Sequence, residues 1–87
     1  MSSTKKDAQV LIYTTRACPH CGRAKAYLRD RHVHFRERSL EDSRSALAEF
    51  RHLGGRSVPV ILIGHRRVDG FHPKRIDKAL RHAGLTD

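Results

Sequence analysis

Two cysteines lie three positions apart in the segment Cys18-Pro19-His20-Cys21, and the chain has no other cysteine. A thiolate attacks a disulfide to form a mixed disulfide, which a second thiol then resolves. A separation of three residues brings the second thiol back over the same helical turn, close to the first. The spacing therefore predicts thiol–disulfide exchange, with Cys18 as the nucleophile and Cys21 as the resolving cysteine.

The pair lies where a β-rich run gives way to a helical pattern beginning at Pro19, a residue suited to the first turn of a helix. A cysteine at a helix N-terminus faces unpaired backbone N–H groups and the positive end of the helix dipole, which favour the thiolate. Cys18 should therefore be the more acidic sulfur. Basic side chains nearby add to this effect: Arg16, His20, Arg23 and Lys25. We assign tuning of the active site to Arg16, Pro19 and His20.

The periodicity of the rest of the sequence predicts the elements that position the pair. Predicted strands occupy 9–14, 33–38 and 58–63, with a short fourth after a turn that begins at Gly64. Predicted helices occupy 19–31, a stretch from an N-cap at Asp42 or Ser43 to a stop at Gly54-Gly55, and a stretch from Pro73 to Gly84. The order β-α-β-α-β-β-α predicts an α/β fold, because crossover helices connect parallel strands and the final hairpin adds an antiparallel strand.

Composition narrows the classes of protein to which the chain can belong. A length of 87 residues predicts one domain over 1–87, with 1–8 as a flexible lead-in. No apolar run reaches the roughly 20 residues of a membrane span, and no signal-peptide pattern follows the N-terminus, so a cytoplasmic protein without membrane contact is predicted. Lys and Arg outnumber Asp and Glu by 18 to 9, and the net charge of +9 favours anionic partners. Aromatic residues that could stack on bases are few, so nucleic-acid binding is not expected.

Three segments together resemble the glutaredoxin family of the thioredoxin-like superfamily: 10–21, 56–64 and 68–71. They occur in the order and at the separations typical of that family. The resemblance implies a thioredoxin-like fold with a four-stranded mixed sheet flanked by three helices. It also implies a thiol–disulfide oxidoreductase that reduces disulfides of proteins or small molecules, and we expect a monomer with no bound cofactor or metal. In that family the Val58-Pro59 peptide is cis and lies beside the sulfurs, where its backbone edge pairs with a substrate.

The resemblance leaves the electron donor open between glutathione and thioredoxin reductase. Glutaredoxins that use glutathione usually carry Gly-Gly near the start of the last helix, followed by acidic residues, whereas 68–73 of this chain reads VDGFHP. The Gly-Phe-x-Pro part resembles NrdH-type redoxins, which thioredoxin reductase re-reduces. Arg16 and Arg56 are candidates for binding the carboxylates of glutathione. The candidate contacts to substrate or glutathione are Arg56, Val58, Pro59, Asp69, Gly70 and Phe71.

His20 occupies the position where glutaredoxins usually carry Tyr, and the sequence Cys-Pro-His-Cys is similar to that of DsbA-type thiol oxidants. When His20 is protonated, this cation two residues past the nucleophile stabilises the thiolate and so favours the dithiol form of the couple. We therefore predict a couple that is less reducing than that of a thioredoxin.

Two other uses of the Cys-x-x-Cys segment stay open. A structural zinc site needs four ligands, but the chain lacks a second Cys-x-x-Cys and its histidines do not show the usual ligand spacing. An iron–sulfur module is the other alternative, since some glutaredoxins hold a [2Fe–2S] cluster between two subunits. Pro19 and the resolving Cys21 argue against the cluster. Redox chemistry of the dithiol is therefore the main prediction, and no residue is assigned as a metal ligand.

Overall fold

The computed structural model describes residues 9–86, so the predicted lead-in at 1–8 lies outside the described part of the chain. Within that part, four strands and three helices follow one another in the order β-α-β-α-β-β-α, which confirms the predicted α/β architecture. The strands are β1 (Val10–Thr14), β2 (Arg36–Ser39), β3 (Val60–Ile63) and β4 (Arg66–Asp69). The helices are α2 (Pro19–Asp30), α3 (Arg44–His52) and α4 (Pro73–His82).

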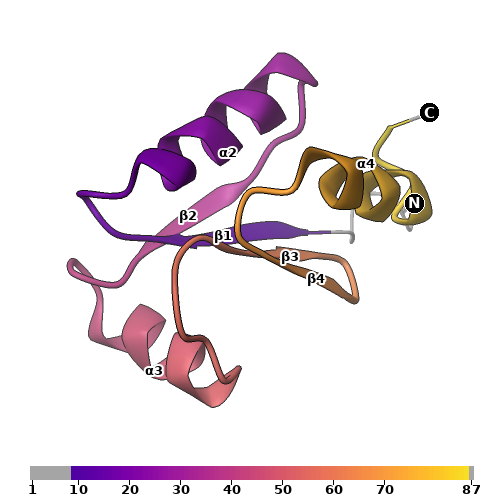
Figure 1. Ribbon diagram of the computed structural model, residues 1–87. Coiled ribbons are helices and arrows are strands. Elements are labelled where there is room, and N and C mark those ends of the chain that lie inside the picture. The colour runs from indigo at the N-terminus through magenta and orange to yellow at the C-terminus, as the bar shows by residue number, and fades with distance from the viewer. Residues whose placement is uncertain (1–8, 87) are drawn as a thin grey trace.

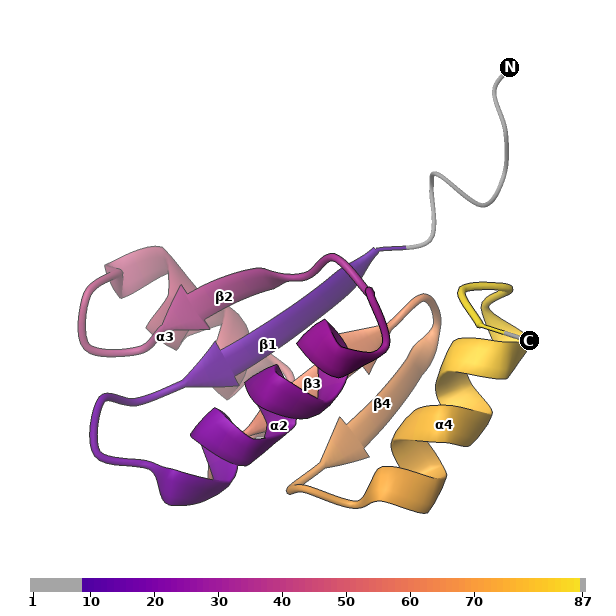
Figure 2. The ribbon, with the colours of Figure 1, turned by 90° about the horizontal axis from the view of Figure 1, so that it is seen from above.

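The strands form one mixed sheet in the order β2-β1-β3-β4. β1 pairs with β2 in parallel, whereas β3 pairs antiparallel with both β1 and β4. Helices α2 and α4 cover one face of the sheet and α3 covers the other, as Figure 1 shows. Figure 2, viewed from above, shows β4 at the edge of the sheet with α4 beside it. Pairing of Tyr13 with Val60, and of Val60 with Asp69, brings the end of β1, the start of β3 and the end of β4 together.

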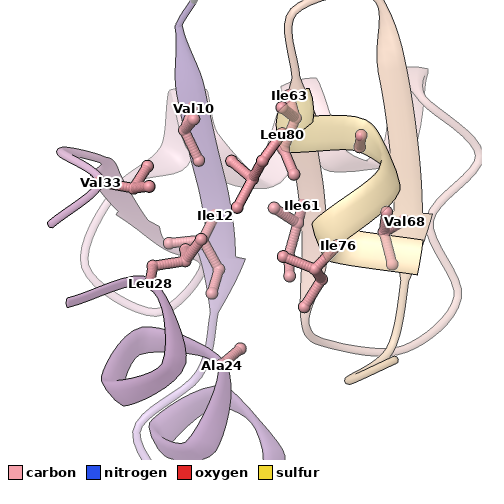
Figure 3. Packing of buried hydrophobic residues seen from close by; sticks show 11 residues of the cluster. Val10, Ile12, Ala24, Leu28, Val33, Ile61, Ile63, Val68, Ile76 and Leu80 are labelled. Atoms are coloured by element: carbon pink, nitrogen blue, oxygen red, sulfur yellow. The ribbon is translucent and has the colours of Figure 1, made fainter. Parts of the chain in front are cut away.

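Alternation of side chains along the strands builds a hydrophobic cluster on each face of the sheet. On the side of α2 and α4, the largest buried residues are Ile12, Leu28, Ile61, Ile63, Ile76 and Leu80 (Figure 3). On the side of α3, the buried residues are Tyr13, Phe50 and Val60. Burial of one Leu or Ile side chain is worth roughly 1.5–3 kcal/mol. The larger cluster therefore fixes α2, which begins next to Cys18, against the sheet.

Each of the three helices α2, α3 and α4 ends in the same type of hydrogen-bonded turn, which needs one residue with positive φ. Gly54 (φ 73°) supplies it after α3 and Gly84 (φ 75°) after α4, as their places in the sequence predicted. After α2 the residue is His32, with φ 57°, although it carries a side chain. The N–H of Val33 then donates to the Leu28 carbonyl oxygen at 3.0 Å. Val33 therefore belongs to the turn that ends α2.

Three predicted strands begin later than expected, and the one predicted over 9–14 does so by a single residue, at Val10. The strand predicted over 33–38 is β2, which starts at Arg36, because the N–H of Val33 is used in the turn that ends α2. The strand predicted over 58–63 starts at Val60, because Pro59 has no N–H to donate to a neighbouring strand. The helix predicted over 19–31 ends one residue earlier, at Asp30.

The start of α3 distinguishes the two residues predicted as its N-cap. Ser43 is the cap, and its Oγ accepts the N–H of Ala46 at 3.2 Å. Asp42 instead accepts a hydrogen bond from the guanidinium of Arg16. The segment between β2 and α3 is thereby tied to the loop that precedes Cys18.

Candidate active site

Cys18 is the N-cap residue of α2, and this position sets the geometry of its sulfur. Its backbone is extended, with φ −127°, and its Sγ accepts the N–H of Cys21 at 3.1 Å. Pro19, which has no N–H, occupies the first helical position, and His20 follows it as an exposed residue. A backbone N–H directed at a sulfur stabilises negative charge there. The N-cap position thus directs the backbone N–H of Cys21 at the Cys18 sulfur.

Cys21 is buried, with 1% of its surface exposed, whereas Cys18 is partly exposed. Both cysteines are free thiols. Burial, together with a hydrogen bond to the Cys18 sulfur, raises the pKa of the Cys21 thiol to about 12, although the backbone of Thr15 and the charge of Lys25 act in the opposite direction. Cys21 is therefore protonated at neutral pH, and Cys18 is the more exposed of the two sulfurs.

The segment that precedes β3 lies against the Cys18 sulfur. The Val58–Pro59 peptide bond is cis, as the resemblance implied, and the Cys18 thiol donates to the Val58 carbonyl oxygen at 3.8 Å. The N–H of Gly70 donates to the Pro59 carbonyl oxygen at 2.7 Å, which ties the loop after β4 to the same place. Three of the predicted contact residues, Val58, Pro59 and Gly70, are therefore linked to Cys18 by direct or consecutive contacts.

The two arginines suggested for carboxylate binding have different surroundings. The guanidinium of Arg16 pairs with Asp42, and its Nε lies 3.9 Å from Oε1 of Glu41. Arg56 is exposed and forms no ion pair within residues 9–86. Arg16 thus lines the groove beside the sulfurs with its charge compensated, whereas the charge of Arg56 is open to solvent.

The remaining predicted contacts, Asp69 and Phe71, are also held by neighbours. Both carboxylate oxygens of Asp69 accept hydrogen bonds from Arg67, at 2.6 and 3.1 Å. Phe71 is half-buried against the core, and its ring meets that of Tyr27 edge to face, with centroids 5.6 Å apart. The Tyr27 hydroxyl donates to Asp77 at 2.8 Å, which joins α2 to α4. Phe71 is thus positioned by packing between these two helices.

A groove of about 610 Å³ opens beside both sulfurs. Its lining includes a polar network in which Glu37 accepts from Thr14 Oγ1 at 2.7 Å and from Lys25 Nζ at 2.9 Å. The hydrogen bond from Thr14 and the Lys25 ammonium lower the pKa of the Glu37 carboxyl. This network holds the charge of Lys25 on the side of α2 that carries Cys21.

Two members of this network, Thr14 and Glu37, were missed by the sequence analysis. Lys25 follows Cys21 by four residues, so helical spacing alone places the two on one face of α2. Glu37 reaches the site because β1 and β2 pair in parallel with Ile12 opposite Glu37. No local pattern in the sequence specifies that register.

Within residues 9–86, no group of three or more His, Cys, Asp or Glu side chains gathers in a way that could hold a metal ion. Every histidine in this range is exposed. In the same part of the chain, no helix combines the length and apolar character needed to cross a bilayer.

A family model described as glutaredoxin matches residues 10–68, which include both cysteines and Pro59. The chain belongs to the glutaredoxin family. Membership makes this glutaredoxin-family protein a thiol–disulfide oxidoreductase in general terms. In that family, disulfides of proteins are substrates, and glutathione or a reductase supplies the electrons. The resemblance seen in the three sequence segments is thus confirmed.

Individual relatives agree with this assignment. A glutaredoxin from Pseudomonas aeruginosa is 39% identical over 79 residues, which cover 90% of each chain. A glutaredoxin-like 8.6 kDa protein in the rubredoxin operon of Clostridium pasteurianum is 35% identical over 72 residues, or 82% of this chain and 96% of that one. Among solved structures, the glutaredoxin-like NrdH-redoxin from Escherichia coli matches with a TM-score of 0.75 and 27% identity, covering 80% of this chain and 92% of that one. The thioredoxin-like fold of this glutaredoxin-family protein is thereby confirmed.

Proposed function

We propose that the protein reduces disulfides through a dithiol mechanism in which Cys18 attacks and Cys21 resolves. The contrast between the two sulfurs carries this proposal. Cys18 is partly exposed at the start of α2 and accepts a backbone N–H, whereas Cys21 is buried one turn further on. The exposed sulfur is open to a substrate, and the buried sulfur is held close enough to act on the mixed disulfide that results.

The proposed reaction transfers two electrons from the dithiol to the substrate disulfide. The Cys18 thiolate forms a bond to one substrate sulfur, the substrate S–S bond breaks, and the released sulfur takes up a proton. Cys21 then loses its proton and attacks the Cys18 sulfur, which releases the second substrate thiolate. The products are a reduced substrate and a Cys18–Cys21 disulfide. A donor must then supply two electrons and two protons to restore the dithiol.

Replacement of each cysteine tests the assignment of the two roles. Cys18→Ser should abolish reduction of insulin disulfides, because no exposed thiolate remains. Cys21→Ser should still attack but should stop at the mixed disulfide, which is detected as a covalent adduct by mass spectrometry under non-reducing conditions. Substantial activity in Cys18→Ser, or an adduct on Cys21 of that variant, would contradict the proposed order of attack.

We further propose that thioredoxin reductase, rather than glutathione, re-reduces the disulfide, and that the protein acts on other proteins as a cytoplasmic monomer. Two candidate contacts for the charged groups of glutathione already have partners: Arg16 pairs with Asp42, and Asp69 pairs with Arg67. The similar NrdH-redoxin from Escherichia coli is described as having a thioredoxin-like activity profile. Both observations support the choice of donor.

The donor is tested by reducing the oxidised protein in two parallel assays. One contains thioredoxin reductase with NADPH, and the other contains glutathione with its reductase and NADPH. We expect the first rate to exceed the second at least about tenfold, a difference of about 1.4 kcal/mol in activation free energy. The opposite ranking would overturn the choice of donor and leave the dithiol mechanism standing.

A variant at β4 shows whether the Asp69 ion pair is the reason for the slower reduction by glutathione. Arg67→Gln removes both hydrogen bonds to the Asp69 carboxylate and should raise the rate with glutathione, because that carboxylate becomes free to bind an ammonium group. Arg66→Gln is the matched control, since it changes the same charge on the neighbouring residue without touching Asp69. Equal rates in the two variants would show that the ion pair does not limit the use of glutathione.

A further inference from the structure

The positive charge of the protein is unevenly compensated. Within residues 9–86, every carboxylate side chain except that of Asp30 forms an ion pair with a Lys or Arg. The basic residues used in this way are Arg16, Lys25, Arg31, Arg38 and Arg67. The other Lys and Arg residues in this range have no carboxylate within ion-pair distance, so the net charge of +9 resides mainly on them.

Several of these uncompensated cations meet at the edge of the sheet, where β4 and α4 lie side by side (Figure 2). A hollow of about 160 Å³ lies between the two elements. Its floor includes the buried residues Val68 and Ala79, which are 3% and 2% exposed. The other residues that line it are all basic: Arg66, Arg67, Arg75 and Lys78. Among residues 9–86, no acidic side chain is part of the lining.

The backbone geometry explains why these cations gather there. Arg66 lies two residues before Val68 on β4, so both side chains project from the same face of the sheet, the one that α4 covers. Arg75 and Lys78 lie three residues apart on α4 and therefore share one side of the helix. The three side chains come from two elements and converge on one hollow.

Arg67 contributes differently from the other three basic residues. Its guanidinium pairs with Asp69 and also donates to the Leu53 carbonyl oxygen. Three charges in the hollow thus have no carboxylate partner in the described part of the chain: those of Arg66, Arg75 and Lys78. Like charges this close repel one another, and an anion placed among them would remove that repulsion.

We propose that this hollow between β4 and α4 is a binding site for a phosphate-class oxyanion, either free phosphate or the phosphoryl group of a small molecule. A dianion compensates more of the three charges than a single carboxylate does. The guanidinium groups of Arg66 and Arg75 present planar donor pairs that suit two oxygens of one phosphate. Lys78 adds a third donor as a point charge. The site is separate from the sulfurs and from the groove beside them.

The proposal is tested by titrating the reduced, ¹⁵N-labelled protein with inorganic phosphate, while sodium chloride keeps the ionic strength constant. We expect saturable shifts in the backbone amides of β4 and of the first two turns of α4. The triple variant Arg66→Gln, Arg75→Gln, Lys78→Gln should raise the dissociation constant at least about tenfold, because charge-assisted hydrogen bonds are lost. Single variants of the same residues serve the same purpose if the triple variant does not fold.

A second triple variant separates this site from the overall charge. Arg36→Gln, Arg44→Gln, Arg51→Gln removes the same number of charges from exposed positions that pair with no carboxylate of residues 9–86. Its dissociation constant for phosphate should stay within about twofold of the unaltered protein. An equal loss in both triple variants, or unsaturable shifts over the whole surface, would overturn the proposal.

Parallel titrations identify the chemical source of the anion. Tighter binding of adenosine diphosphate than of phosphate at the same amides would assign the site to a phosphorylated small molecule, and equal binding would assign it to phosphate itself. Binding of glutarate as tight as that of phosphate would overturn the phosphate class. Because the triple variant at β4 and α4 leaves both cysteines intact, its insulin reduction should be unchanged, and the outcome does not depend on the proposed redox function.

Discussion

At the scale of single residues, Cys18 and Cys21 are the same amino acid with different surroundings. Cys18 precedes the first turn of α2, where a backbone N–H is available to its sulfur. Cys21 points into the protein and loses contact with water, which raises the pKa of its thiol to about 12. One turn of helix therefore separates a partly exposed sulfur from a buried one. That division of exposure is what a two-step exchange of disulfides requires.

His20 allows a direct test of how the residues between the cysteines set the redox couple. We expect His20→Tyr to lower the reduction potential by roughly 30 mV, equivalent to about 1.4 kcal/mol, because tyrosine cannot carry the positive charge by which a protonated histidine stabilises the dithiol form. The potential is measured by equilibration against redox buffers of known potential. His52→Tyr, at an exposed position on α3, is the control and should leave the potential unchanged. An unchanged potential in His20→Tyr would refute the proposed effect.

At the scale of the elements, the sequence predicted most of the helix boundaries and fewer of the strand boundaries. Gly54 and Gly84 carry a visible signal, because positive φ favours glycine. The end of α2 carries none, since the same backbone conformation is occupied by His32. The alternation of Val33 and Phe35 therefore favoured a strand that in fact begins only at Arg36. Local patterns fail here because packing of the whole fold overrides the preference of one residue.

The end of α2 is accordingly a place where stability should increase on mutation. His32→Gly should stabilise the protein by about 0.5–1 kcal/mol, because glycine adopts positive φ without the steric cost of a Cβ atom. The free energy of unfolding is measured by urea titration of the reduced protein. His34→Gly is the matched control, and it should not stabilise, because His34 does not have positive φ. Equal stabilisation by both variants would show that φ at His32 carries no strain.

At the scale of the whole molecule, the sequence predicted the position of the dithiol but not all of its neighbours. The motif places Cys18 and Cys21, and the family resemblance places Pro59 beside them. The network around Glu37 depends on the register between β1 and β2, and the ion pair of Asp69 depends on the conformation of Arg67. Such long-range pairings depend on the three-dimensional fold, so the local spacing of residues in the sequence does not predict them.

Burial of Cys21 links the stability of the reduced molecule to pH. The pKa of this thiol is about 12 in the folded chain, against an ordinary value of 9.0. Between these values the folded state keeps the proton that the unfolded state loses, so the folded state binds more protons. The free energy of unfolding should therefore be unaffected by this group below about pH 9 and should fall as pH rises toward 12.

The contribution of Cys21 is isolated by comparing the reduced protein with Cys21→Ser in urea titrations on both sides of about pH 9. Burial also raises the pKa of the Tyr13 and Tyr27 hydroxyls, so both proteins lose stability in alkali for that reason. The reduced protein should lose stability more steeply than Cys21→Ser, because serine has no thiol to ionise. The oxidised protein should resemble the variant, since a disulfide sulfur carries no proton. Parallel curves for all three forms would mean that burial does not raise the pKa of the Cys21 thiol. The assignment of Cys18 as the attacking sulfur and Cys21 as the resolving sulfur would then lose its physical basis.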